Sequence, residues 1–463
     1  MTPPEPGPAN PTTTRHMEAI MLQDTQQTAY RTECRNAYPD TAGASGARKD
    51  TASDIDTFKS IIERYIKPLI YGADLRGPVE NGGKRRDAVA FDTIHRLVIA
   101  VPERRDLSFI LERPLPFTEE EKKLVETVMH RVHKDAIHTS GAFHLLACNA
   151  VEEALALHVS PEYPETVYKV LQLYNQWAAE THEGKKLVHT IGICPVKNHK
   201  KSPSIFALKE TSAIKKLAAD EGCMLTVAGD GSLLGMENTA TKNNALRKNH
   251  SILAPVSMTD IALWTNTGGK IAIRLTAGGE ILIFKNKTLV FARRRSLWRC
   301  LPHKRMLEEL ITANDNTEER EAQLATYLTM LDLAFSRTGA CLGVLKYAPE
   351  TAPALVSPDV LFASASMTPT VAMLKTVING RKFQELPRKL RKQLCALDGA
   401  VLLDASGTIL TAGAIVKTDG NPDGGGGRSA AARILGPKGA GVKVSSDGFI
   451  EIYLGNQPLP GFA

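Results

Sequence analysis

The sequence has no apolar run that approaches the ~20 residues of a membrane-spanning helix. Its first residues, Met1–Pro8, have neither the basic start nor the apolar stretch of a secretory signal. The seven cysteines are dispersed and include no Cys-x-x-Cys pair, which is typical of reduced thiols and not of a disulfide framework. We therefore expect a cytoplasmic protein with no membrane partner.

A strong excess of one sign of charge is also missing. The formal net charge is +7 over 463 residues, which suits an anionic ligand but does not require nucleic acid. Basic residues gather at 84–86, 197–201 and 293–295, and such runs are most often solvated loops or strand ends. A nucleic-acid-binding module is therefore the weakest interpretation of this chain.

The length indicates a multidomain protein, because 463 residues exceed the usual size of one hydrophobic core. Segments with helical periodicity and segments with strand character both occur, so we expect an α/β fold. The first 50 residues are rich in Pro, Thr, Ala, Gln and Gly and lack a sustained apolar period, which is typical of disorder. The expected parts are a disordered tail (1–50), an N-terminal α/β domain (51–195), a β-rich sensor-like module (196–300), a helical connector (301–334) and a C-terminal domain (335–463).

Four consecutive glycines, Gly424–Gly427, precede Arg428 and a short segment that we expect to be helical up to Gly436. A glycine loop that opens a helix presents unpaired N–H groups and the positive end of the helix dipole to an anion. The run is not a Walker A motif, because no Gly-Lys-Ser/Thr follows it. Taken alone, it is more often an ordinary loop before a helix.

Asp398 stands directly before Gly399 and an apolar stretch, 400–403, that predicts a strand. A carboxylate in this place can hold a metal ion or activate a hydroxyl, although Asp-Gly before a strand is more often a turn. The order of the two features favours a nucleotide site in which the acid serves a metal and the loop holds phosphates.

Short motifs between residues 335 and 455 follow one another in an order that resembles the diadenylate cyclase domain, the nucleotide-binding domain of DNA-integrity scanning proteins. Those domains begin with a strand similar to 339–345, continue with Asp-Gly-Ala, matched by Asp398–Ala400, and then form a hairpin similar to 406–416. Next come Gly-Thr-Arg-His-Arg-Ala-Ala and Val-Ser-Glu-Glu before a glycine, where this chain has Gly426–Ala432 and Val444–Gly448.

The resemblance implies a mixed sheet flanked by helices and the condensation of two ATP molecules into cyclic di-AMP. It also implies a Mg²⁺ or Mn²⁺ cofactor and a homodimer or higher homo-oligomer in which two sites face each other. Asp398 would be the catalytic and metal-binding residue. The implied nucleotide-binding residues are Gly399, Ala400, Gly424, Gly425, Gly426, Gly427, Arg428, Ser429, Ser445, Ser446 and Asp447.

This chain departs from the family motif where the family grips phosphates with Arg-His-Arg, because Ser429 and Ala430 follow Arg428. Charge-assisted hydrogen bonds are the strong ones, so their loss leaves two interpretations open. One is an active cyclase with a rebuilt grip from glycine N–H groups and nearby cations such as Lys417, Arg433 or Lys438. The other is a catalytically silent sensor of a nucleotide or cyclic dinucleotide.

Overall fold

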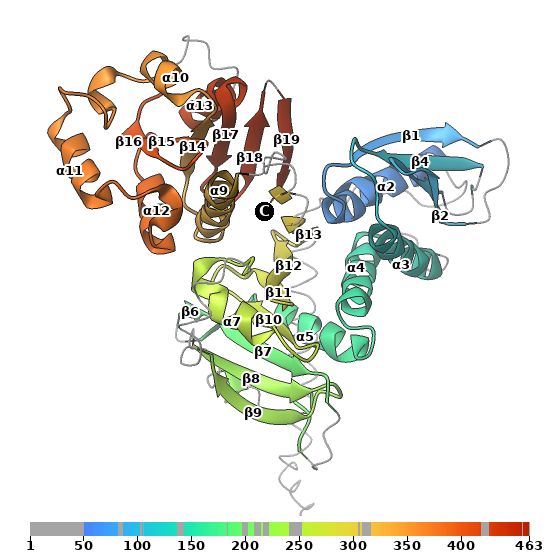
Figure 1. Cartoon of the computed structure of the whole chain (residues 1–463). Coiled ribbons are helices and arrows are strands. Elements are labelled where there is room, and N and C mark those ends of the chain that lie inside the picture. Colours follow the sequence, from blue (N-terminus) through green and yellow to red (C-terminus); the bar gives the residue numbers. More distant parts are fainter. Residues whose placement is uncertain are drawn as a thin grey trace, which may run out of the picture.

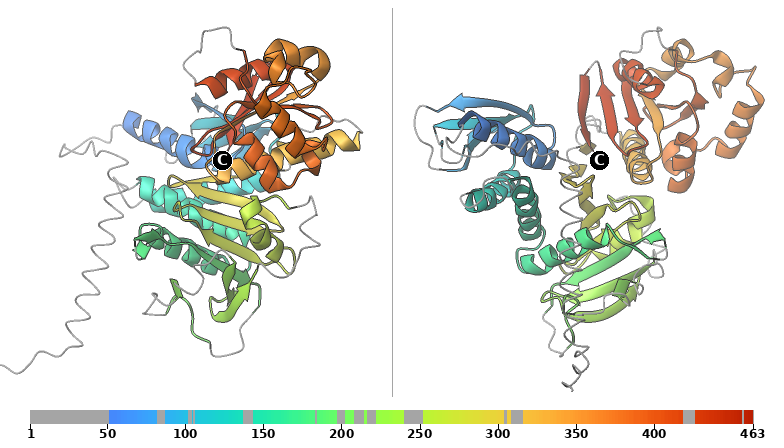
Figure 2. Two further views of the ribbon diagram at one scale, coloured as in Figure 1. Left: turned by 90° about the vertical axis from the view of Figure 1, so that its left-hand side faces the viewer. Right: turned by 180° about the vertical axis from the view of Figure 1, so that it is seen from behind.

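The computed structural model describes residues 51–81, 87–101, 104, 106–136, 143–182, 184–196, 202–207, 214–215, 222–239, 252–303, 306–307, 316–417, 426–455 and 457–462. The expected tail, 1–50, lies outside these residues. Sheets of four, seven and six strands form three bodies together with their helices, which confirms the expected α/β fold class. The seven-stranded sheet lies below the four-stranded and six-stranded sheets in Figures 1 and 2.

The N-terminal body combines an antiparallel sheet, ordered β1-β4-β3-β2, with helices. Its strands β3 and β4 pair in antiparallel fashion. The elements are α2 (Thr51–Ile61), β1 (Asp74–Glu80), β2 (Val89–Thr93), β3 (Arg96–Ala100), β4 (Leu107–Glu112), α3 (Glu119–Ala136), α4 (Phe143–Val159) and α5 (Pro164–Trp177).

The second sheet has the order β13-β12-β11-β10-β7-β8-β9 and is antiparallel except between β7 and β8. Strand β7 pairs with both β8 and β10, so this sheet crosses the domain boundary expected between residues 195 and 196. Its elements are β7 (His189–Cys194), β8 (Cys223–Ala228), β9 (Leu233–Asn238), α7 (Thr259–Trp264), β10 (Ile271–Leu275), β11 (Ile281–Lys285), β12 (Thr288–Arg294) and β13 (Leu297–Cys300).

The C-terminal body is a mixed sheet of order β16-β15-β14-β17-β18-β19, in which only β14 and β15 run parallel. Alternate residues of β14 enter different cores: Cys341 packs with α13, and Leu342 packs with α9. The elements are α9 (Thr317–Phe335), β14 (Ala340–Leu345), α10 (Ala348–Leu355), α11 (Pro369–Ile378), α12 (Arg388–Cys395), β15 (Ala400–Asp404), β16 (Ile409–Ala414), α13 (Gly427–Leu435), β17 (Gly439–Val444), β18 (Ile450–Leu454) and β19 (Gln457–Phe462).

Helix α9 joins the second and third bodies through one continuous hydrophobic core. All ten residues from Ala325 to Ala334 are buried, and the same core contains Phe284 of the seven-stranded sheet and Val442 of β17. A helix that is buried all round belongs to the interior of a large unit. The segment expected as a connector is therefore part of the core. No helix among the described residues is long and apolar enough to cross a bilayer.

Buried His303 bridges this core. Its Nε2 lies 2.6 Å from the carbonyl oxygen of Leu289, so Nε2 carries the proton and donates. Its Nδ1 therefore accepts from the hydroxyl of Tyr327, at 2.7 Å. Burial lowers the pKa of His303 from 6.5 to about 4. His189 is buried in the seven-stranded sheet, and burial likewise lowers its pKa to about 4.

Because His303 titrates near 6.5 when unfolded and near 4 when folded, the unfolded chain binds more protons between these pH values. The free energy of unfolding should therefore fall as the pH drops from 6.5 to 4. A His303→Gln variant offers a donor and an acceptor but cannot titrate. Its pH dependence should be shallower than the parent's by up to ~1.4 kcal/mol per pH unit, measured by urea unfolding. Equal slopes for the two proteins would contradict the assignment.

Candidate functional site

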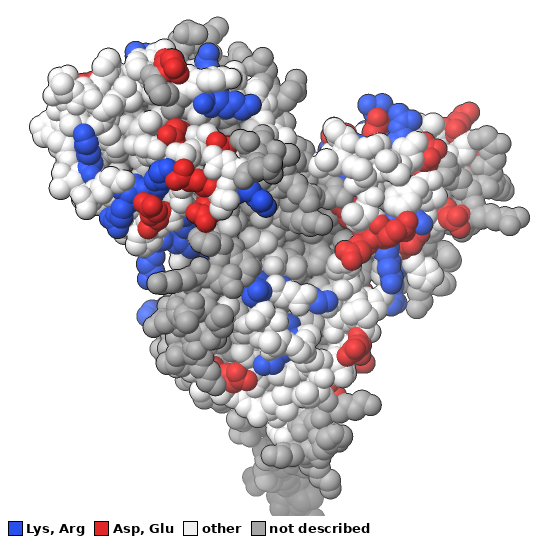
Figure 3. Space-filling model, viewed as in Figure 1, with Lys and Arg blue, Asp and Glu red and all other residues white. Residues whose placement is uncertain are grey.

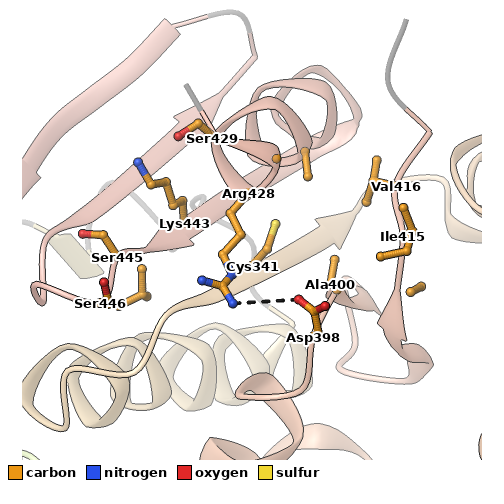
Figure 4. Close-up of a pocket in the computed structure, with 16 residues that line it drawn as sticks. Cys341, Asp398, Ala400, Ile415, Val416, Arg428, Ser429, Lys443, Ser445 and Ser446 are labelled. Carbon is orange, nitrogen blue, oxygen red and sulfur yellow. Dashed lines mark ion pairs between the residues drawn. The ribbon is translucent and has the colours of Figure 1, made fainter. Parts of the chain in front are cut away.

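A pocket of about 510 Å³ opens at one end of the central strands of the six-stranded sheet (Figure 4). Strands β14 and β15 begin there, β16 and β17 end there, and α13 points its N-terminus into it. Small-molecule sites usually have volumes of about 300–1,000 Å³. The lining residues are Cys341, Asp398, Gly399, Ala400, Ala414, Ile415, Val416, Gly426, Gly427, Arg428, Ser429, Ala431, Lys443, Val444, Ser445 and Ser446.

Most residues of the predicted site line this pocket. Those that do are Asp398, Gly399, Ala400, Gly426, Gly427, Arg428, Ser429, Ser445 and Ser446. Gly424 and Gly425 lie outside the described residues. Asp447 is not among the lining residues, and its carboxylate instead faces Arg295 of the seven-stranded sheet, with 3.2 Å between Oδ2 and Nη2.

Backbone geometry places Asp398 at the rim. Gly399 has φ of 103°, and a Cβ there would lie 2.5 Å from the carbonyl carbon of Gly413. Only glycine allows this conformation and this approach to β16. The side chain of Asp398 stands just before the strand and is 98% exposed. It is the only carboxylate among the described lining residues.

Arg428 extends from the first turn of α13 towards Asp398, and 4.0 Å separate its Nη2 from Oδ1 of Asp398 (Figure 4). The guanidinium lies against the backbone that enters β14, because a Cβ on Gly339 would be 2.4 Å from Nη1. Cys341 forms part of the pocket lining, and burial raises the pKa of its thiol to about 12. Its side chain therefore contributes a neutral surface beside the charged groups.

The second half of helix α13 lies unusually close to the sheet. Gly343 of β14 and Gly441 of β17 are paired across the strands and form a flat patch. A Cβ on Gly441 would lie 1.9 Å from the carbonyl oxygen of Ala432. Gly426 begins the helix, and no side chain caps it among the described residues. Its first-turn N–H groups and dipole therefore suit an anion in the pocket.

Lys443 is a pocket cation that the sequence analysis did not identify. It lies on β17 two residues before Ser445, and its Nζ is 2.9 Å from Oε1 of Glu451. Neighbouring Val442 and Val444 pack in the α9 core, so the period of two in β17 turns Lys443 towards the pocket. That alternation is the signal that could have found it.

The cations proposed from the sequence as substitutes lie elsewhere. Lys417, Arg433 and Lys438 are not among the residues that line the pocket, whereas Arg428 and Lys443 are. The two replaced positions also differ, since Ser429 lines the pocket and Ala430 does not. Two cations, a helix N-terminus and serine hydroxyls thus oppose a single carboxylate.

A metal would find one protein ligand in the pocket. Among the described residues, no group of three or more His, Cys, Asp or Glu is placed to hold an ion. Mg²⁺ commonly binds through one or two carboxylates and the phosphates of a substrate. Asp398 therefore suits a metal that arrives with a polyphosphate and not a preformed cage.

Surface charge gives no sign of a nucleic-acid track on the face in Figure 3. Lys and Arg side chains are interspersed with Asp and Glu on the C-terminal body there. A one-signed basic stripe, the usual footprint of a nucleic-acid binder, is not visible among the described residues of this face.

No family model matches the sequence, and no curated protein matches it.

A Gly441→Ala substitution should destabilise the C-terminal body, because the methyl group would overlap the backbone of α13. We expect a loss of about 3 kcal/mol in the free energy of unfolding. Gly427→Ala is the matched control, since a Cβ there meets nothing within 4 Å. Urea unfolding of both variants measures the difference, and equal stabilities would show that α13 does not rest on the glycine patch.

Proposed function

We propose that the C-terminal body binds an adenine nucleotide in this pocket, with its phosphates at the N-terminus of α13. The observation that carries the proposal is the convergence of Arg428, Lys443 and that helix terminus on one cavity. Each of them favours an anion, and together they suit a polyphosphate better than a single carboxylate ligand.

Each polar group has a role in this proposal. Arg428 offers a planar fork that matches phosphate oxygens, and Lys443 supplies a second positive charge. Ser446 supplies a hydroxyl at the end of β17, and neighbouring Ser445 lines the pocket while its hydroxyl donates to Asp447. A Mg²⁺ or Mn²⁺ ion would bind Asp398 together with the phosphates, and its chemistry would be to neutralise charge on them.

The resemblance to diadenylate cyclases leads us to propose catalysis as well. The 3′-hydroxyl of one ATP would attack the α-phosphate of another, forming a 3′-ester bond and breaking the bond to the β-phosphate. Repeating the step from the second 3′-hydroxyl gives cyclic di-AMP and two pyrophosphates. Asp398 would orient the hydroxyl, and its exposure at the rim leaves it accessible to a nucleotide on a facing second copy. This proposal includes a cytoplasmic location, where ATP is available.

A catalytically silent nucleotide or cyclic-dinucleotide sensor is the alternative. One observation favours it: the third position of the family's phosphate motif is Ala430, which does not line the pocket. Lys443 is also paired with Glu451, so part of its charge is already compensated. A weakened grip is compatible with binding but reduces the stabilisation of a charged transition state.

Catalysis is tested by mass spectrometry of the purified protein, first for co-purified nucleotide and then for product after incubation with ATP and Mn²⁺. We expect cyclic di-AMP from the parent and none from Asp398→Asn, because the amide is near-isosteric but is not an anionic ligand. Unchanged melting curves would show that the variant is folded. Nucleotide binding without product in the parent supports the sensor, and product from Asp398→Asn contradicts the role of this residue.

Binding is tested by calorimetry with ATP. Loss of a charged hydrogen bond costs roughly 1.5–3 kcal/mol, so Arg428→Ala should bind about tenfold to a hundredfold more weakly. Gly339→Ala keeps the arginine but moves it, because the new methyl group would lie 2.4 Å from Nη1. The affinity of Gly339→Ala should be intermediate, and its stability should be close to the parent's because the displaced atoms end a flexible chain. Parent-like affinity in Arg428→Ala would refute the phosphate site.

A further inference from the structure

The hairpin between β12 and β13 reaches the C-terminal body through a two-residue turn. Arg294 pairs with Leu297, so the turn consists of Arg295 and Ser296, with φ of 48° and 63°. Two-residue turns with both φ positive favour Asn-Gly, and each ordinary residue there costs roughly 1–2 kcal/mol. Stored backbone strain of this kind often marks a functional contact.

Arg294 is buried and connects three parts of the molecule. Its Nε lies 3.0 Å from Oε1 of Glu280, which also pairs with Arg337. Its Nη1 and Nη2 donate at 3.2 Å to the carbonyl oxygens of Gly448 and Ala334. The guanidinium therefore joins the seven-stranded sheet to the end of α9 and to the turn after β17.

Arg295 contacts the same turn through Asp447, with 3.2 Å between Nη2 and Oδ2. Asp447 in turn accepts hydrogen bonds from the hydroxyl of Ser445 and from the N–H of Phe449, the latter at 3.2 Å. The Ser445 hydrogen bond is the main cause that lowers the pKa of Asp447. The Asp447 carboxylate thus orders its own turn through Ser445 and Phe449, and Arg295 of the hairpin contacts the same carboxylate.

Gly448 shows how tightly the two bodies meet. It has φ of 88°, and a Cβ would lie 2.6 Å from Nη1 of Arg294 and 2.7 Å from the carbonyl oxygen of Ala334. No side chain larger than hydrogen fits between the arginine and the turn. The position of the turn is therefore set by the seven-stranded sheet.

We propose that Arg294 and Arg295 of the seven-stranded sheet are positioning residues that set the nucleotide affinity of the pocket by holding the 445–448 turn. Ser445 and Ser446 on this turn line the pocket, so any displacement of the hairpin moves them relative to Arg428. The inference rests on the proposed nucleotide binding and adds its control from another body. Coupling of this kind is reciprocal, so bound nucleotide must also stabilise the hairpin.

Affinity for ATP, measured by calorimetry on the full chain, tests the coupling. Arg295→Gln removes an exposed ion pair and should weaken binding about twofold to fivefold. Arg294→Lys keeps a charge beside Glu280 but cannot reach both carbonyl oxygens, and it should weaken binding about tenfold. Arg104→Gln is the control, because it removes an exposed pair, Arg104 with Asp106 at 2.9 Å, in the N-terminal body. It should bind as the parent does.

A double-mutant cycle separates positioning from general destabilisation. Asp447→Asn keeps the acceptor for Ser445 and Phe449 but loses the charge that Arg295 contacts. Adding Arg295→Gln to Asp447→Asn should therefore cost no further affinity. Additive losses would mean that Arg295 acts by another route and would overturn the inference.

Hydrogen exchange supplies a readout that needs no catalysis. ATP should slow amide exchange in the 294–298 hairpin of the parent, and this protection should shrink in Arg295→Gln. If all variants bind ATP with the same Kd, or if ATP does not protect the hairpin from exchange, this inference alone is overturned. A parent that binds no ATP overturns the proposed function as well, so the two failures are distinguishable.

Discussion

The hydrogen bonds of the buried Asp332 carboxylate help to join the pocket-bearing body to the rest of the molecule. It lies on α9 and accepts hydrogen bonds from Nε and Nη2 of Arg388 on α12 and, at 2.7 Å, from the N–H of Val256 beside the seven-stranded sheet. Burial raises the pKa of Asp332, and Arg388 opposes this shift. Removing one partner of such a pair typically costs about 3–5 kcal/mol. The pair lies within the C-terminal body, and its hydrogen bonds with Val256 and with the carbonyl oxygen of Ala254 constrain how the two sheets are oriented.

That constraint explains why the position of the seven-stranded sheet and the position of the pocket residues depend on each other. Helix α9 is buried along ten residues between the two sheets, and it ends beside Ala334, whose carbonyl oxygen meets Arg294. The turn after β17 lies at the same place. Interfaces that are packed and charge-paired tend to move as units and not by gradual deformation, so the upstream sheet and the turn share one position.

The parts of the site that local sequence signals encode were predictable. Asp398 before a strand and the glycine-led start of α13 depend on neighbouring residues, and the structure places both at the pocket. Contacts between distant residues were not predictable. Asp447 was expected in the nucleotide site, but its partner Arg295 is 152 positions away. In the same way, the sequence placed β7 in the first domain, because its pairing with β10 joins residues that are far apart in the chain and leaves no local signal.

The paired glycines Gly343 and Gly441 have a consequence for the stiffness of the site. A helix that rests on side chains can be displaced slightly as rotamers adjust, but α13 rests on backbone atoms at Gly441. No rotamer can absorb a shift there. The second half of α13 is therefore fixed against the backbone of β17, so the helix can shift as a whole only if the strands themselves bend.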